Sequence, residues 1–130
     1  LPDVVTADLG SVVQAVRADL DGDGIEEVLV TYEYITDPDF GAQDDFTSIY
    51  VRFPSSDGSV RDVPLLTYVM EDPVDFPTVG RYTTAAIADL NGDGVMEVAI
   101  RDRFWESAGI AVYALVDGRL SYTMGGGCGV

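Results

Sequence analysis

The sequence predicts an all-β fold made of two four-stranded antiparallel units that pack together. Three observations support this prediction. An acidic, glycine-rich loop occurs twice, at residues 19–27 and 89–97, with a period of 70 residues. Stretches in which apolar and polar residues alternate, a pattern typical of half-buried strands, flank both copies. An internal repeat of this length is also a stronger fold signal than local propensity.

The first unit is expected over about residues 10–70. Its second strand shows the alternation most clearly, because Leu29, Thr31 and Glu33 point to one face and the valines and tyrosines between them to the other. The four strands are predicted at residues 12–20, 27–34, 47–53 and 59–68, with the acidic loop between the first two and a turn at 54–58.

The second unit, at about residues 80–125, repeats this order. Its strands are predicted at residues 82–90, 97–104, 109–116 and 119–124, with a turn at Asp117 and Gly118. We expect one domain, residues 1–130, because repeats of this kind bury their faces against their neighbours. The residues expected to be hidden are Val28, Val30, Ile49, Val51, Val98, Ile100, Ile110 and Val112.

Each acidic loop has the residue order of a calcium site. Oxygen-bearing side chains stand at positions 1, 3, 5 and 9, and glycines at positions 4 and 6 allow the tight curl that gathers oxygens around one hard cation. The loop is not an EF-hand loop, because position 12 is Val30 or Ile100 and neither can ligate a metal. We therefore predict two calcium ions. The expected ligands are Asp19, Asp21, Asp23, Glu27 and the Ile25 carbonyl in the first loop, and Asp89, Asn91, Asp93, Glu97 and the Val95 carbonyl in the second.

The alternative interpretation is that the Asp-Gly and Asn-Gly pairs mark plain hairpin turns, which is their commonest use in β proteins. Two copies that both carry a carboxylate three residues beyond the last glycine favour the metal site, because a plain turn does not need that order. Leu20 and Leu90, at position 2, are expected to anchor the loops against a core.

The pattern Ala-Asp-Leu-Asp/Asn-Gly-Asp-Gly-x-x-Glu-Val, clearest at residues 17–30 and 87–100, resembles the FG-GAP and VCBS-type repeats of integrin-like β-propellers. The resemblance covers most of the chain and implies that each unit is like a propeller blade, with a calcium loop on the sheet rim. It also implies an extracellular protein that serves adhesion, recognition or scaffolding more often than catalysis. The number of units departs from the family, since a closed propeller needs at least about four blades.

The composition limits the partners. A net charge of −16, with seven arginines and neither lysine nor histidine, argues against nucleic acid and anionic membrane surfaces, which would be repelled. No segment is apolar enough to insert into a membrane. A second acidic group, which lacks ordered ligand spacing, is expected in a solvated loop and comprises Asp37, Asp39, Asp44 and Asp45. We expect a monomer whose units pack on each other; completion by another chain is the alternative.

The chain lacks the residues on which most catalytic sites depend. Without histidine or lysine and with one cysteine, the usual base-and-nucleophile pairs are absent. Paired carboxylates suffice for glycoside cleavage, but the ordered ones are assigned to metal. We therefore expect a non-catalytic, extracellular calcium-binding module with a structural or recognition role and a protein or glycan partner. The alternative is an accessory domain of a secreted hydrolase that contacts a polysaccharide through Trp105 and nearby tyrosines.

Two further segments leave alternatives open. Residues 101–106 are a candidate recognition surface, because Trp and Arg are enriched at binding hot spots. The alternative explains them better: Phe104 and Trp105 alternate in facing, so one is expected in the core and the other over a sheet edge. Cys128 has no partner within the chain, so it is either a free thiol near a frayed terminus or pairs with another chain. The glycine run around it leads us to expect that the natural chain continues.

Overall fold

The structure is a computed structural model that describes residues 10–71, 80–104 and 106–129. Within these residues the chain is all β, and no helix in this part of the chain could cross a membrane. β1 to β4 form one antiparallel sheet in sequence order, and β5 to β8 form a second, which confirms the predicted fold. The strands are β1 (Ser11–Ala18), β2 (Glu27–Tyr34), β3 (Phe46–Pro54), β4 (Val60–Val69), β5 (Arg81–Ala88), β6 (Glu97–Arg103), β7 (Ser107–Val116) and β8 (Arg119–Gly129).

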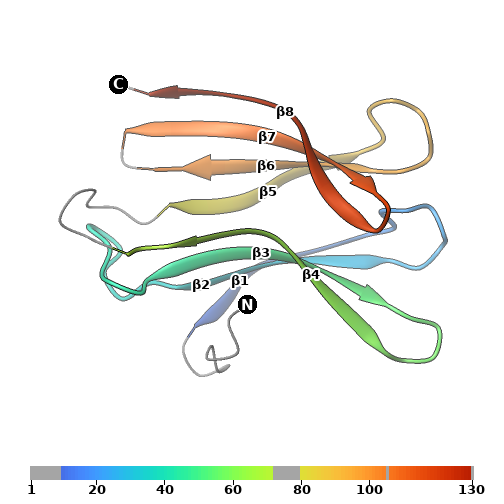
Figure 1. Ribbon diagram of the computed structural model, residues 1–130, viewed down its shortest axis with the longest axis horizontal. Helices are drawn as coiled ribbons and strands as arrows, with labels where there is room; N and C mark the ends of the chain where they lie inside the picture. The colour runs from blue at the N-terminus through green and yellow to red at the C-terminus, as the bar shows by residue number, and fades with distance from the viewer. Residues whose placement is uncertain (1–9, 72–79, 105, 130) are drawn as a thin grey trace.

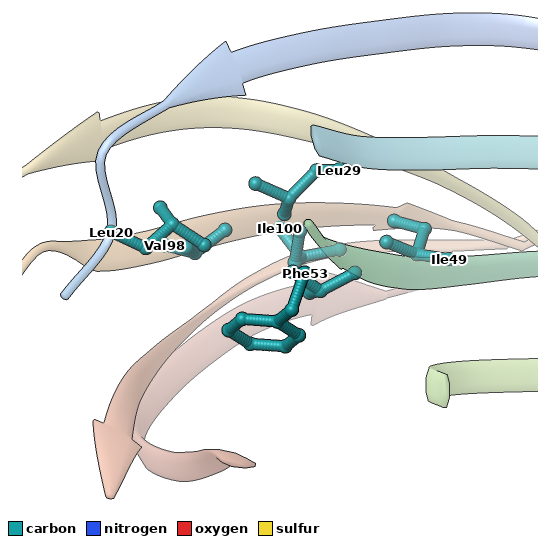
Figure 2. Packing of buried hydrophobic residues seen from close by; sticks show 7 residues of the cluster. Leu20, Leu29, Ile49, Phe53, Val98 and Ile100 are labelled. Carbon is teal, nitrogen blue, oxygen red and sulfur yellow. The ribbon is translucent and has the colours of Figure 1, made fainter. Parts of the chain in front are cut away.

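The two sheets lie face to face, with the β1–β2 and β5–β6 loops projecting from the same end of the molecule (Figure 1). A shared hydrophobic core fills the space between them. Figure 2 shows Leu20 of the first loop beside Val98, and Leu29 and Phe53 close to Ile100. The buried members of this core are Leu20, Leu29, Ile49, Val51, Phe53, Val98 and Ile100.

The two sheets do not present equivalent faces to this core. β2 turns Leu29 toward it, whereas β6 turns Val98 and Ile100 toward it. After a shift of one repeat, these two residues correspond to Val28 and Val30, which lie on the opposite face of β2 from Leu29 because side chains alternate along a strand. The first sheet therefore packs with the face that carries Leu29, and the second sheet packs with the opposite, non-equivalent face, which carries Val98 and Ile100.

This arrangement decides which of the expected core residues are hidden. Val28 and Val112 are only half-buried, and Ile110 is 44% exposed, so the prediction was wrong for these three. Ile110 and Val112 lie on the face of β7 that points away from the first sheet. The predicted residues that are buried are Val30, Ile49, Val51, Val98 and Ile100.

Polar contacts join β5 to the first sheet. The Gln14 side-chain amide of β1 pairs with the Thr84 backbone: Nε2 donates to the Thr84 carbonyl at 3.0 Å, and the Thr84 N–H donates to Oε1 at 2.9 Å. Thr84 lies at a register shift where regular pairing with β6 is interrupted. Arg81 Nη2 donates to Oε2 of the buried Glu33 carboxylate at 3.0 Å. Because these contacts are directional, they fix how the sheets lie on each other.

β8 continues to Gly129, beyond the predicted end at Met124, and its glycines pair with β7 instead of fraying. The two strands approach each other closely here. A Cβ added at Gly127 would lie 2.9 Å from the carbonyl oxygen of Ala108, closer than real Cβ contacts allow. The glycine run, which weakens a strand for lack of side chains, thus permits this pairing. Cys128 is exposed on this strand.

Asp45 is fully buried, so the prediction of a solvated acidic loop was wrong for this residue. Its Oδ1 accepts hydrogen bonds from the N–H and the hydroxyl of Thr36 at 2.9 and 2.7 Å, and its Oδ2 accepts the N–H groups of Ala42 and Asp37 at 2.9 and 3.3 Å. Burial raises the pKa of the Asp45 carboxyl, but these hydrogen bonds outweigh burial and hold the pKa below its usual value. One carboxylate therefore organises the β2–β3 connection.

We predict that Asp45→Asn lowers the free energy of unfolding at pH 7 by about 1–3 kcal/mol, because an amide NH₂ would face buried donors and leave them unsatisfied. Denaturant unfolding of both proteins measures this difference. Asp44→Asn is the matched control: Asp44 is exposed, and its φ of 68° is one that Asn tolerates. Equal losses in the two variants would contradict the role of Asp45.

The same carboxylate predicts a pH dependence. Because the pKa of Asp45 is lower in the folded than in the unfolded chain, its contribution is fully present above the unfolded Asp pKa of about 3.9 and is lost as the pH falls through the folded pKa. The stability difference between native protein and Asp45→Asn should therefore shrink below about pH 4. A difference that stays constant down to the acid transition would refute this linkage.

Candidate metal centre

The backbone follows the same course in both acidic loops. Gly22 and Gly24 have φ angles of +79° and +88°, and Gly92 and Gly94 have +79° and +87°. These angles lie in the left-handed region, which glycine enters at no steric cost and other residues resist. The glycines at positions 4 and 6 therefore give each loop the tight curl that the sequence predicts.

The carboxylate at position 1 holds this curl. Asp19 Oδ1 accepts the Gly22 N–H at 2.8 Å, and its Oδ2 accepts the Gly24 N–H at 2.9 Å. Asp89 makes the same two hydrogen bonds in the second loop. Backbone hydrogen bonds, above all the one from the Gly94 N–H, hold the pKa of the Asp89 carboxyl below its usual value. The side chains at positions 3 and 5 each accept the N–H two residues further on, in both loops. The loop side chains thus fix the loop backbone.

The glutamate at position 9 closes each loop across its neck. Glu27 and Glu97 are buried, with exposed fractions of 2% and 6%. Glu27 Oε2 accepts the N–H of Leu20 at 2.7 Å, and Glu97 Oε2 accepts the N–H of Leu90 at the same distance. The sequence assigns this glutamate to metal, and its bond to the position-2 backbone was not predicted. A separation of seven residues hides such a contact from local patterns.

Three side chains of the first loop come together as a cation site would require. Asp19, Asp21 and Glu27 each offer a carboxylate oxygen within 4.8 Å of the others. Two oxygens that share one calcium ion at 2.3–2.6 Å lie at most about 5 Å apart, so this group fits one hard cation. Asp23 is not part of this group, and its Oδ1 accepts the N–H of Ile25. Ile25, whose carbonyl is the fifth expected ligand, is itself 38% exposed.

The second loop differs from the first at position 3. Asn91 replaces a carboxylate there, and its Nδ2 donates to Glu97 Oε1 at 3.2 Å. Asp93 Oδ1 accepts the N–H of Val95, as its counterpart does in the first loop. The expected ligand side chains of the second loop therefore carry one fewer negative charge than those of the first. They are Asp89, Asn91, Asp93 and Glu97.

Electrostatics in the first loop favour a bound cation. Burial raises the pKa of the Glu27 carboxyl, the hydrogen bond from Leu20 N–H opposes this rise, and the charges of Asp21 and Asp23 add to it. Glu27 is therefore harder to ionise than an ordinary glutamate. A divalent cation among these groups would relieve the repulsion that raises the pKa.

The two loops touch each other. The Leu20 carbonyl accepts the N–H of Met96 at 2.8 Å, and Leu20 itself is fully buried beside Val98 (Figure 2). Leu90, at the same position of the second loop, is 65% exposed. The prediction of a core anchor is therefore confirmed for Leu20 and wrong for Leu90. Leu90 faces the side of the second sheet that points away from the first.

The surface beside the loops includes a groove between β1 and β5. Its lining includes Val16, Asp19, Ala86 and Met96. The other candidate recognition segment, residues 101–106, is only partly described. Its Phe104 packs against Tyr68 and Tyr82 in T-shaped contacts with ring centroids 5.4 and 6.5 Å apart, whereas Trp105 lies outside the described residues.

A family model described as an FG-GAP-like repeat matches residues 19–100. The match begins at the first residue of the first loop and includes the whole of the second loop. It therefore covers more than half of the chain and both candidate sites. Comparison with curated proteins and with solved structures gave no match.

The unequal burial of the two loop leucines predicts unequal effects of the same substitution. Leu20→Ala should lower the free energy of unfolding by about 2–5 kcal/mol, because it opens a cavity in the shared core. Leu90→Ala, the matched control, should change it by less than about 0.5 kcal/mol. Urea unfolding at a fixed calcium concentration measures both. Similar losses in the two variants would mean that the loops are anchored alike.

Proposed function

Because this chain belongs to the FG-GAP-like repeat family, we propose that it is an extracellular, non-catalytic module that binds calcium and serves a structural or recognition role. The observation that carries this proposal is the matched hydrogen-bond frame of the two loops. In each loop, the aspartate at position 1 accepts the N–H groups of the glycines at positions 4 and 6, and the glutamate at position 9 accepts the N–H of the leucine at position 2. Plain hairpin turns need no such frame.

Calcium is the cation that suits these donors. All expected ligands are hard oxygens from carboxylates, one amide and backbone carbonyls, which are the ligands that calcium prefers. Members of this repeat family commonly bind calcium in this loop. In the first loop Asp19, Asp21 and Glu27 would hold the ion, and in the second Asp89, Asn91 and Glu97 would do so. The remaining oxygens would come from Asp23 and Asp93 and from the carbonyls of Ile25 and Val95.

The role we assign to calcium is stabilisation. A bound ion neutralises carboxylates that otherwise repel one another at the end of the two sheets, close to the core residue Leu20. The two ions together would reduce the formal charge from −16 to about −12. A recognition role would use the surface next to the loops, where the groove between β1 and β5 reaches Asp19.

Removal of calcium should therefore lower the melting temperature. At a free calcium concentration about 100 times the Kd, each site stabilises the folded chain by roughly 2.7 kcal/mol. Excess EGTA empties both sites and should lower the midpoint by roughly 20 °C, and re-addition of calcium should restore it. Magnesium at the same concentration is the control for ionic strength. An unchanged midpoint in EGTA, with no calcium detected by elemental analysis, would refute the proposal.

The first loop should bind calcium more tightly than the second, because affinity rises with the number of charged ligands. Asn91 marks the difference. Asp21→Asn gives the first loop the side-chain set of the second, and Asn91→Asp does the reverse. We expect the first change to weaken one site and the second to tighten the other in calorimetric titrations. Equal native affinities, or opposite shifts, would contradict the charge argument.

A further inference from the structure

We propose that the two loops are coupled, so that a divalent cation in the first loop raises the affinity of the second loop for calcium. The coupling would pass through the hydrogen bond from the Met96 N–H to the Leu20 carbonyl. This inference rests on the proposed function, because it requires that both loops bind calcium. It adds that they do not bind independently.

A short series of contacts links the two sites. Glu27, a ligand expected in the first loop, accepts the N–H of Leu20 at 2.7 Å. The carbonyl of Leu20 accepts the N–H of Met96 at 2.8 Å. Met96 stands between Val95 and Glu97, two ligands expected in the second loop. Two hydrogen bonds therefore join a ligand of one site to the backbone that carries ligands of the other.

The peptide bond between Val95 and Met96 transmits the constraint. A peptide unit is planar and trans, so its C=O and N–H point in opposite directions. When the Leu20 carbonyl holds the Met96 N–H, it also fixes the direction of the Val95 carbonyl, which is an expected calcium ligand. A cation that holds Glu27 in place fixes Leu20 in turn, and the second loop then loses less freedom when it binds.

The two loops can approach each other closely because Gly22 has no side chain. A Cβ built on Gly22 would lie 2.8 Å from the carbonyl oxygen of Gly94, which is too close for a side chain against backbone. Gly92, the equivalent residue of the second loop, has the same φ of +79° and nothing within 4 Å of its Cβ position. Alanine at either position would therefore suffer similar backbone strain from the positive φ, but only Gly22→Ala forces the loops apart.

The charges of the two sites act against this coupling. A cation in the first loop makes its surroundings less negative, which by itself weakens binding of a second cation nearby. Disabling the first loop should therefore tighten the second loop if charge alone links them. The structural link predicts the reverse, so the sign of the effect separates the two mechanisms.

The test titrates calcium into ¹⁵N-labelled protein and follows the amide signals of Gly24 and Gly94 as reporters of the two loops. Asp21→Ala disables the first loop; Asp21 is exposed, and its carboxylate accepts one backbone hydrogen bond, from Asp23. We expect the Gly94 midpoint to rise about five-fold or more in this variant, within the usual range of coupling between sites.

The glycine variants locate the coupling. In the Gly22→Ala background, Asp21→Ala should shift the Gly94 midpoint less than about two-fold, whereas in the Gly92→Ala background the five-fold shift should remain. An unchanged or lower Gly94 midpoint in Asp21→Ala alone would overturn the proposal. So would equal loss of coupling in both glycine backgrounds. Absence of any calcium response at either glycine in the native chain would instead refute the proposed function.

A measurement without glycine variants covers the case in which Gly22→Ala does not fold. Asp93→Ala disables the second loop and leaves the first intact. Calcium should then slow hydrogen exchange of the Met96 amide, because filling the first loop holds the Leu20 carbonyl in place. An exchange rate of Met96 that calcium does not change, while Gly24 responds, would overturn the coupling.

Discussion

The burial of Leu29, Ile49 and Val51 against Val98 and Ile100 is the interaction on which the rest of the structure depends. Each such side chain contributes roughly 1.5–3 kcal/mol when removed from water, so these few residues match the whole net stability of a typical domain, about 5–15 kcal/mol. The polar contacts between the sheets set geometry, since they add little energy by comparison. Packing therefore brings the loops together, and the loops do not have to assemble themselves.

This packing also explains what the sequence could predict of the fold. Strand order and loop positions follow from the repeat and from alternation within each strand, which are local properties. The choice of face does not follow, because the two units share the same apolar pattern and equivalent residues are therefore expected to be equally buried. One sheet uses the face of Leu29, while the other uses the face of Val98, so residues one repeat apart have different environments. Leu20 and Leu90 share a motif and differ completely in exposure for this reason.

In the candidate site, too, the features set within one loop could be predicted and the contacts between distant segments could not. The order of oxygens and glycines along each loop predicts the curl and the grouping of Asp19, Asp21 and Glu27, because all are set within nine residues. The contact between Leu20 and Met96 depends on how two distant segments pack, and no local pattern contains it. The same is true of Asp45. It stands in an acidic stretch without regular ligand spacing, and it becomes a buried acceptor only when the β2–β3 connection folds around it.

The glycine-bearing strand β8 has a consequence for behaviour in solution. It lies at the edge of its sheet, as β4 does in the other, and an unpaired edge offers its N–H and C=O groups to other chains. Along β4, Arg61, Asp62 and Pro64 discourage such pairing by charge and by a missing donor. β8 carries no charge after Arg119 and exposes Cys128. Of these two edges, β8 is therefore the more open to another chain at high concentration, and an oxidant could make such an association covalent through Cys128.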